Sequence, residues 1–226
     1  MKRVDLASPT PREVELPYSE FPYQVEEKSY LPRPEPLPKV SLSDVLASRQ
    51  SRRIFKTVHQ QHLNSLLWHA ARAITVNSPK GSRWQHRPTP SAGGKHPIDL
   101  LVFPEPHNSK DVFLYDPVSH ALAKLKIANR RSLDQFLITT NLVVALEQAT
   151  IIWFGAQFER TLSKYINGES LVWRDAGALI TSISLVAESL GLSCCAIGIT
   201  GEPFISHMLD SKEKVIGVGG VLLGQR

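Results

Sequence analysis

Anion-binding side chains are concentrated in the segment Arg49-Gln50-Ser51-Arg52-Arg53. A guanidinium group offers two parallel hydrogen bonds to a phosphate, so a run of arginines with a hydroxyl predicts a phosphate site. Basic residues are also favoured at the C-terminal end of a helix, because they offset the helix dipole. From these residues alone, the helix-end interpretation is the stronger of the two.

A loop rich in proline and glycine runs from Arg87 to Pro97 and leads into the apolar run 98–103. Its prolines stiffen the backbone, whereas Ser91–Gly94 offers free amides and glycines that can adopt positive φ. Such a segment lets a flat or anionic ligand lie close to main-chain N–H groups. An ordinary surface turn before a strand explains the same composition about as well.

Lys164 and Tyr165 are adjacent ionisable residues that can exchange a proton with a substrate. Lysine and tyrosine have reference pKa values of about 10, so a base that works near neutrality needs burial or a coupled neighbour. The alternative is the end of an amphipathic helix, with a solvated lysine and a packed tyrosine. Chemistry alone leaves these two interpretations balanced.

Other chemical groupings are weaker. His59 and His62 have helical spacing, but no carboxylate lies near them in sequence, so we predict no metal site. The only cysteines, Cys194 and Cys195, are adjacent; we interpret them as small core residues of a protein from a reducing compartment. No glycine cluster opens a helix, so a dinucleotide-binding fingerprint is absent.

The composition is that of a globular protein. The chain has 226 residues, of which 42% are hydrophobic, which suits one domain with or without an extension. The net charge of +5 has no long basic run or interleaved aromatic patch, which disfavours nucleic acid and fits a small anionic ligand. The N-terminus has no apolar signal core, and the apolar region 136–154 contains Asn141 and Glu147. We therefore expect a cytoplasmic protein without a membrane span.

The elements that must position these groups predict an α+β fold. Prolines dominate residues 1–40, which we expect to form an extended arm on the domain or on a partner subunit, and residues 41–226 form the domain. Ser41 opens the first helix in a capping box with Asp44, and Gly191 ends the longest helix. Predicted helices are 41–49, 60–74, 132–147, 158–165, 171–190 and 204–209. Predicted strands are 100–103, 112–115, 121–127, 149–154, 193–200 and 215–223, and 77–90 is predicted as loop.

Three of these segments resemble signatures of the flavin-dependent nitroreductase superfamily. The loop at 89–98 resembles its P-S-[AG]-G-[AG]-x-x-P-[IL] motif, with Lys95 and His96 in place of the usual Leu-Tyr. The arginine cluster resembles R-x-S-x-[RK], and residues 191–198 resemble G-L-x-x-x-x-I-G. The closest resemblance is to the SagB-type dehydrogenases, which oxidise azoline rings during thiazole and oxazole peptide maturation.

The resemblance implies a mixed, mainly antiparallel sheet surrounded by helices, and a homodimer that binds FMN at the subunit interface. The loop reaches the flavin ring, commonly from the partner subunit. The strand at 196–200 presents its backbone amides to the redox edge of the flavin. The implied FMN contacts are Arg49, Gln50, Ser51, Arg53, Pro90, Ser91, Ala92, Gly93, Ile197, Gly198 and Arg226.

The azoline dehydrogenases also carry a Lys-Tyr pair at the position of Lys164 and Tyr165, and Asp175-Ala176-Gly177 fall on their Glu-Ala-Gly. Their Tyr-Arg is replaced by Glu169-Ser170. Oxidation of an azoline removes a proton together with a hydride and therefore needs a base. The resemblance thus implies that Lys164 or Tyr165 is catalytic. The alternatives are an NAD(P)H-dependent nitro, quinone or flavin reductase, and a flavin-binding partner subunit without turnover.

Overall fold

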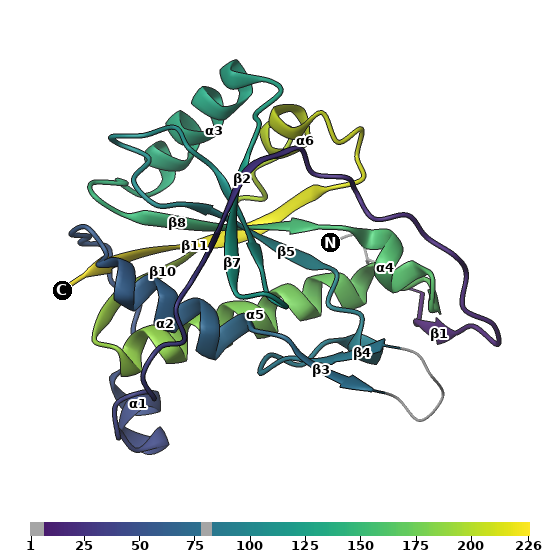
Figure 1. Ribbon diagram of the computed structural model, residues 1–226, viewed down its shortest axis with the longest axis horizontal. Helices are drawn as coiled ribbons and strands as arrows, with labels where there is room; N and C mark the ends of the chain where they lie inside the picture. Colours follow the sequence, from purple (N-terminus) through teal and green to yellow (C-terminus); the bar gives the residue numbers. More distant parts are fainter. Residues whose placement is uncertain (1–6, 78–82) are drawn as a thin grey trace, which may run out of the picture.

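The computed structural model describes residues 7–77 and 83–226 (Figure 1). Seven strands form one central sheet, and every pairing between neighbouring strands in it is antiparallel. This arrangement confirms the predicted α+β class. The strands, in spatial order, are β10 (Leu192–Ile197), β11 (Ile216–Gln225), β8 (Thr150–Ala156), β5 (Ile98–Phe103), β6 (Phe113–Asp116), β7 (Ala121–Leu125) and β2 (Val25–Tyr30).

Helices cover both faces of the sheet (Figure 1). One face carries α2 (Gln60–Ala71) and the long α5 (Glu169–Ser189), with α1 (Leu42–Ser48) beside α5; the other carries α3 (Arg130–Val143) and α6 (Phe204–Leu209). Neighbouring residues of a strand point to opposite faces. Phe154 of β8 therefore packs in the core under α2 and α5, while Trp153 packs with Phe136 under α3.

The long helix α5 is a core element. Among the described residues it is the one helix long and apolar enough to cross a membrane by length and composition. Its side chains Val172, Ala176 and Ile183 instead pack into the core against the sheet. Gly191 ends the helix at a φ of +71°, a left-handed conformation that glycine adopts without steric cost.

Several predicted elements end earlier in the structure: the helix predicted over 132–147 stops at Val143, and the strands predicted over 121–127 and 193–200 stop at Leu125 and Ile197. The helix predicted over 60–74 stops at Ala71, because Ile74 enters a hairpin of β3 (Ile74–Asn77) and β4 (Arg83–His86). Of the loop predicted over 77–90, Asn77 and residues 83–86 belong to this hairpin, and residues 78–82 lie outside the described part. The helix predicted over 158–165 is shorter: α4 (Phe158–Leu162) ends early, and Tyr165 lies in β9 (Tyr165–Ile166).

The N-terminal segment follows the domain in an extended path (Figure 1). β1 (Thr10–Pro11) pairs with β9, and β2 is the edge strand of the central sheet, paired with β7. The proline-rich sequence of the N-terminal segment excludes a helix and suits this extended path. The boundary between the arm and the domain at residue 40 stays a prediction.

Close packing at β11 generates a test of the fold. A Cβ on Gly220 would lie 2.6 Å from the carbonyl oxygen of Ile152 and 2.6 Å from the Trp153 ring. We expect Gly220→Ala to destabilise the protein by about 1–3 kcal/mol, because backbone and a buried indole have to move. The measurement is the midpoint of urea unfolding.

The control is Gly177→Ala in α5, where a Cβ would meet no atom within 4 Å. Alanine raises helix propensity, so this variant should be as stable as the parent or up to about 1 kcal/mol more stable. Equal stability of the Gly220→Ala variant and the parent would contradict the packing described for β11.

Candidate active site

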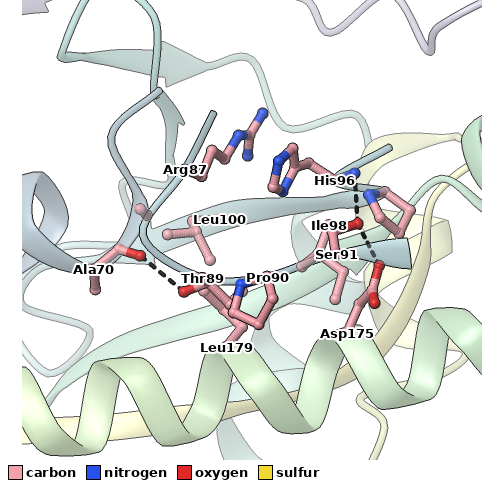
Figure 2. Close-up of a pocket in the computed structure, with 12 residues that line it drawn as sticks. Ala70, Arg87, Thr89, Pro90, Ser91, His96, Ile98, Leu100, Asp175 and Leu179 are labelled. Atoms are coloured by element: carbon pink, nitrogen blue, oxygen red, sulfur yellow. Dashed lines mark hydrogen bonds between the residues drawn. The ribbon is translucent and has the colours of Figure 1, made fainter. Parts of the chain in front are cut away.

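The loop predicted to approach a ligand is fixed by a tight turn. Thr89 Oγ1 donates to the carbonyl of Ala70 in α2 over 2.9 Å (Figure 2). The turn η1 (Ala92–Gly94) follows, with a φ of +60° at Gly93. Residues that carry a side chain rarely adopt positive φ, whereas glycine adopts it without steric cost. The loop therefore presents its backbone in one defined conformation.

Asp175 of α5 holds this loop. Ser91 Oγ donates to Asp175 Oδ2 over 2.5 Å, and the Ala92 amide donates to Oδ1 over 3.1 Å. Ser91 Oγ also accepts from the His96 amide at 2.8 Å, so the hydrogen bonds form a chain across the loop (Figure 2). Burial raises the pKa of Asp175, and the bonds from Ser91 and Ala92 offset part of that rise. The sequence analysis aligned Asp175 with a family position but did not identify this positioning role.

Lys164 and Tyr165 lie against the same loop. Lys164 Nζ donates to the carbonyl of Gly93 over 3.2 Å, across 71 residues of sequence. The same ammonium lies 5.9 Å from the centroid of the Tyr165 ring. A Cβ on Gly93 would come within 2.8 Å of the Tyr165 hydroxyl. The structure thus brings together the predicted proton-transfer pair and the predicted flavin loop.

The N-terminal segment positions that pair. Pro11 is the register partner of Tyr165 in the β1–β9 pairing, and the Arg12 amide donates to the Lys164 carbonyl over 2.8 Å. Arg12 Nε also donates to the carbonyl of Leu162 over 3.0 Å. Residues close to the N-terminus therefore fix the backbone on which the candidate catalytic side chains stand.

The predicted phosphate ligands lie elsewhere, directly after α1. Arg49, Gln50, Ser51 and Arg53 are all exposed. Within the described part of the chain, neither Arg49 nor Arg53 forms an ion pair with an acidic side chain. Two guanidinium groups without acidic partners leave positive charge available to an anion.

Glu188 of α5 joins two further arginines to this region. Its carboxylate pairs with Arg52 Nη1 at 3.1 Å and with Arg226 Nη2 at 2.6 Å. Burial acts to raise the pKa of Glu188, but hydrogen bonds from Ser48 and Arg226 and the charges of both arginines keep it below its ordinary value. Arg226, the predicted C-terminal phosphate ligand, is therefore held beside the arginine cluster.

The strand β10 runs from this cluster to the predicted flavin contacts. Burial raises the pKa of Cys194 to about 11, and the nearby charge of Arg49 acts in the opposite direction. Ala196, on the same face of the strand as Cys194, is exposed, whereas the Ile197 side chain points into the core. Gly198 is exposed too, and a Cβ on it would meet no atom within 4 Å. Backbone at the end of β10 is thus accessible to a ligand.

Apart from Ile197 and Gly198 at the end of β10, the predicted FMN contacts of one chain therefore form two groups. The loop group is anchored at Asp175 and the arginine group at Glu188, both on α5. A helix rises 1.5 Å per residue, so these anchors lie about 20 Å apart along the axis. Arginines and loop residues of the same chain do not meet at one point.

A buried ion pair supports the loop from behind. Arg160 donates to Asp99 over 2.7 Å and 3.2 Å, and also to the carbonyl of His96 over 3.2 Å. Burial alone would lower the pKa of Arg160, but the charge and hydrogen bonds of Asp99 raise it. Sequence reasoning missed this pair; the available signal was a single carboxylate, Asp99, inside an apolar strand.

Comparison with known proteins agrees with the fold described above. A profile of the nitroreductase family matches residues 46–224. Comparison with curated proteins gives no match. Among solved structures, the chain is similar to a provisionally named nitroreductase of Ralstonia eutropha JMP134, with a TM-score of 0.65 and 22% identity over 93% of this chain and 96% of that one.

Two further structures share the fold. A chain of the E. coli microcin synthetase McbBCD complex with truncated pro-MccB17 bound gives a TM-score of 0.58 and 20% identity, over 89% of this chain and 79% of that one. A provisionally named nitroreductase in complex with FMN from Desulfovibrio desulfuricans gives 0.52 and 15%, over 83% and 87%. Because the family profile covers most of its length, this chain belongs to the nitroreductase family of flavin-using enzymes and is an oxidoreductase.

Proposed function

We propose that this protein is an FMN-dependent dehydrogenase of the SagB type that oxidises azoline-like rings of a modified peptide. One observation carries the proposal: Lys164 donates to the carbonyl of Gly93, so an ionisable pair lies against the loop that resembles the flavin-contacting loop of the family. The similarity to a chain of the microcin synthetase complex, which was solved with a truncated precursor bound, supports a peptide substrate.

The residues present fit an FMN. Arg49 and Arg53 carry exposed charge, have no acidic partner among residues 7–77 and 83–226, and would hold the phosphate together with Gln50 and Ser51. Open space above Gly198 would admit a flat ring next to the backbone of β10. FMN, when bound, supplies the two-electron chemistry of hydride transfer.

The protein's own residues supply the proton chemistry in this proposal. Removal of a ring proton needs a base within hydrogen-bond reach, and Lys164 and Tyr165 stand together beside Gly93. We propose that one of them accepts the proton as the base, while the other adjusts the proton affinity of that base. Asp175 keeps the loop at a fixed distance from the pair by holding Ser91.

The arginine cluster generates the first test. Arg49→Ala removes one charge-assisted pair to phosphate, which costs about 1.5–3 kcal/mol. FMN should then bind about ten- to hundredfold more weakly. The measurement is a titration of FMN fluorescence. The control is Arg131→Ala, which removes an exposed arginine of α3 and should leave the affinity unchanged. Retention of parental affinity by the Arg49→Ala variant is the result that contradicts this assignment.

The division of the site supports a homodimer with FMN at its interface. The arginine group and the loop group of one chain are about 20 Å apart along α5, so a second chain would have to supply the missing group. Leu42 and Leu46 of α1 are 65% and 57% exposed, and Trp173 of α5 is 46% exposed. Apolar side chains of this kind give a second copy a surface to bury.

Mixed dimers test this arrangement. An Arg49→Ala chain keeps the loop, and an Asp175→Ala chain keeps the arginines but releases Ser91. Each variant alone should bind FMN weakly, because every site contains the defect. The two chains carry different affinity tags and are co-expressed, and the mixed dimer should recover one site of parental affinity. A mixed dimer without a tight site, or a protein that sediments as a monomer with bound FMN, rules out the shared site.

The catalytic assignment separates the proposal from a plain reductase. General base catalysis contributes about 10²–10⁴-fold, so Lys164→Ala and Tyr165→Phe should each lower azoline oxidation by at least about 10²-fold while FMN stays bound. Lys39→Ala and Tyr30→Phe, at exposed positions, are the matched controls and should keep full turnover. Turnover is followed as azole formation on a peptide substrate.

Two other outcomes favour the alternatives. An NAD(P)H donor delivers hydride directly and needs no such base. Full NAD(P)H-driven quinone reduction by both variants, from a parent that ignores azolines, favours a nitro, quinone or flavin reductase. A bound FMN that neither NAD(P)H nor an azoline peptide reduces, in a protein that co-purifies with a larger enzyme, favours a partner subunit.

We also propose a cytoplasmic location, supported by two free, buried cysteines.

A further inference from the structure

A large cavity opens beside the loop that runs from Arg87 to Pro97, on the side of the loop away from α5. This cleft has a volume of about 710 Å³ and lies between the N-terminal segment and the loop. Its lining includes Gly93 and Lys164, so it reaches the candidate catalytic pair. Tyr18, Tyr23 and Tyr115 contribute aromatic surface to its walls. A cavity of this size holds an organic ligand or a short peptide segment.

Most cations that line the cleft are already neutralised. Lys28 pairs with Asp116 at 2.7 Å, Lys95 pairs with Glu15, and Arg160 pairs with Asp99 at 2.7 Å. Arg87 and Lys164 are different, because within the described part of the chain neither forms an ion pair; Lys164 donates to the carbonyl of Gly93. The Arg87 side chain donates a hydrogen bond from Nη2 to Gln85 Oε1 over 3.0 Å. Its Nε is buried and has no hydrogen-bond partner.

The carboxylate whose charge acts most strongly on Arg87 does not form an ion pair with it. Asp99 acts on Arg87 through its charge, but its oxygens already accept from Tyr23 at 2.9 Å, from Gln157 at 2.6 Å and from Arg160 at 2.7 Å and 3.2 Å. Burial is the main effect on Arg87 and lowers the pKa of its guanidinium to about 10, which still leaves it charged at neutral pH. A buried charge without a partner is unfavourable unless a ligand completes it.

His96 stands beside this guanidinium as a neutral group. Figure 2 shows the two side chains on the same side of the loop, close to each other. Burial, and then the charge of Arg87, lower the pKa of His96 to about 4, so the imidazole is uncharged at neutral pH. A neutral imidazole can donate one hydrogen bond without adding charge. The backbone of Gln85 already takes a hydrogen bond from this ring, so the pair offers one positive charge beside an uncharged imidazole.

We propose that Arg87, beside the neutral His96, binds a carboxylate group of the substrate in this cleft. The guanidinium fork matches the two oxygens of a carboxylate, and the one positive charge of Arg87 matches the single negative charge of that group. The smaller cavity in Figure 2, which the same two residues also line, has a volume of about 30 Å³ and is too small for an organic ligand. The ligand therefore occupies the larger cleft, with its reacting part toward Lys164. That the bound group is a substrate rests on the proposed function; the carboxylate site itself does not.

Calorimetric titration with small probes tests the site. Benzoate supplies a carboxylate and an aromatic ring for the tyrosine walls, benzamide is its neutral counterpart, and inorganic phosphate represents the competing anion. The purified protein should bind benzoate at least about tenfold more tightly than benzamide or phosphate. Arg87→Gln should weaken benzoate about ten- to hundredfold, as expected for loss of a charge-assisted pair. Lys28→Gln removes a cleft cation that Asp116 already neutralises and should change the affinity less than twofold.

A second readout covers the case in which Arg87→Gln does not fold. In the parent, benzoate should shift the NMR signal of one buried arginine Nε–H, and this signal should be missing in Arg87→Lys. Equal benzoate binding by the parent and Arg87→Gln, equal binding of benzamide and benzoate, tighter binding of phosphate, or no shift of an arginine signal would each overturn the proposal. Flavin content is measured separately from the visible spectrum. A protein that binds benzoate through Arg87 but takes up no FMN would therefore refute the proposed function and leave the carboxylate site intact.

Discussion

The ion pair between Asp99 and Arg160 connects the parts that surround the candidate site. Asp99 lies on the central strand β5, Arg160 on α4, and Arg160 also bonds the carbonyl of His96 at the end of the loop. Tyr23 and Gln157 also donate hydrogen bonds to the Asp99 carboxylate, and Gln157 accepts a hydrogen bond from the amide of Phe21 over 2.7 Å. Loss of either charged partner would leave a buried charge uncompensated, which typically costs 3–5 kcal/mol. The loop, α4 and the N-terminal segment therefore depend on one another through this pair.

The helix α5 distributes the remaining functional groups. Asp175 near its N-terminal end holds the loop, and Glu188 near its C-terminal end holds Arg52 and Arg226. Because both anchors are on one rigid helix, the loop and the arginines cannot approach each other within a chain. A site built on this plan keeps its two halves at a constant separation, which suits completion by a second copy.

The loop itself contacts two sets of side chains that line the same cleft. Its backbone faces Lys164 and Tyr165, while His96, at a φ of +44°, directs the chain back toward β5 and lies beside Arg87. Lys95 and His96 are also the positions at which this sequence departs from the family motif. The features that are particular to this chain thus gather on the cleft side of the loop, where we propose that substrate is selected.

Local features of this protein could be predicted from its amino-acid sequence. Apolar periodicity predicted the helices and the buried strands, Ser41 and Gly191 marked helix ends correctly, and the loop motif indicated where a ligand would approach. Signals of this kind depend on neighbours within a few residues. Which distant groups meet became known from the three-dimensional structure alone. Lys164 and Gly93 are 71 residues apart, and Arg160 and Asp99 are 61 apart. The register of the antiparallel sheet sets such pairs, and it follows from packing of the whole core, so no local pattern contains it.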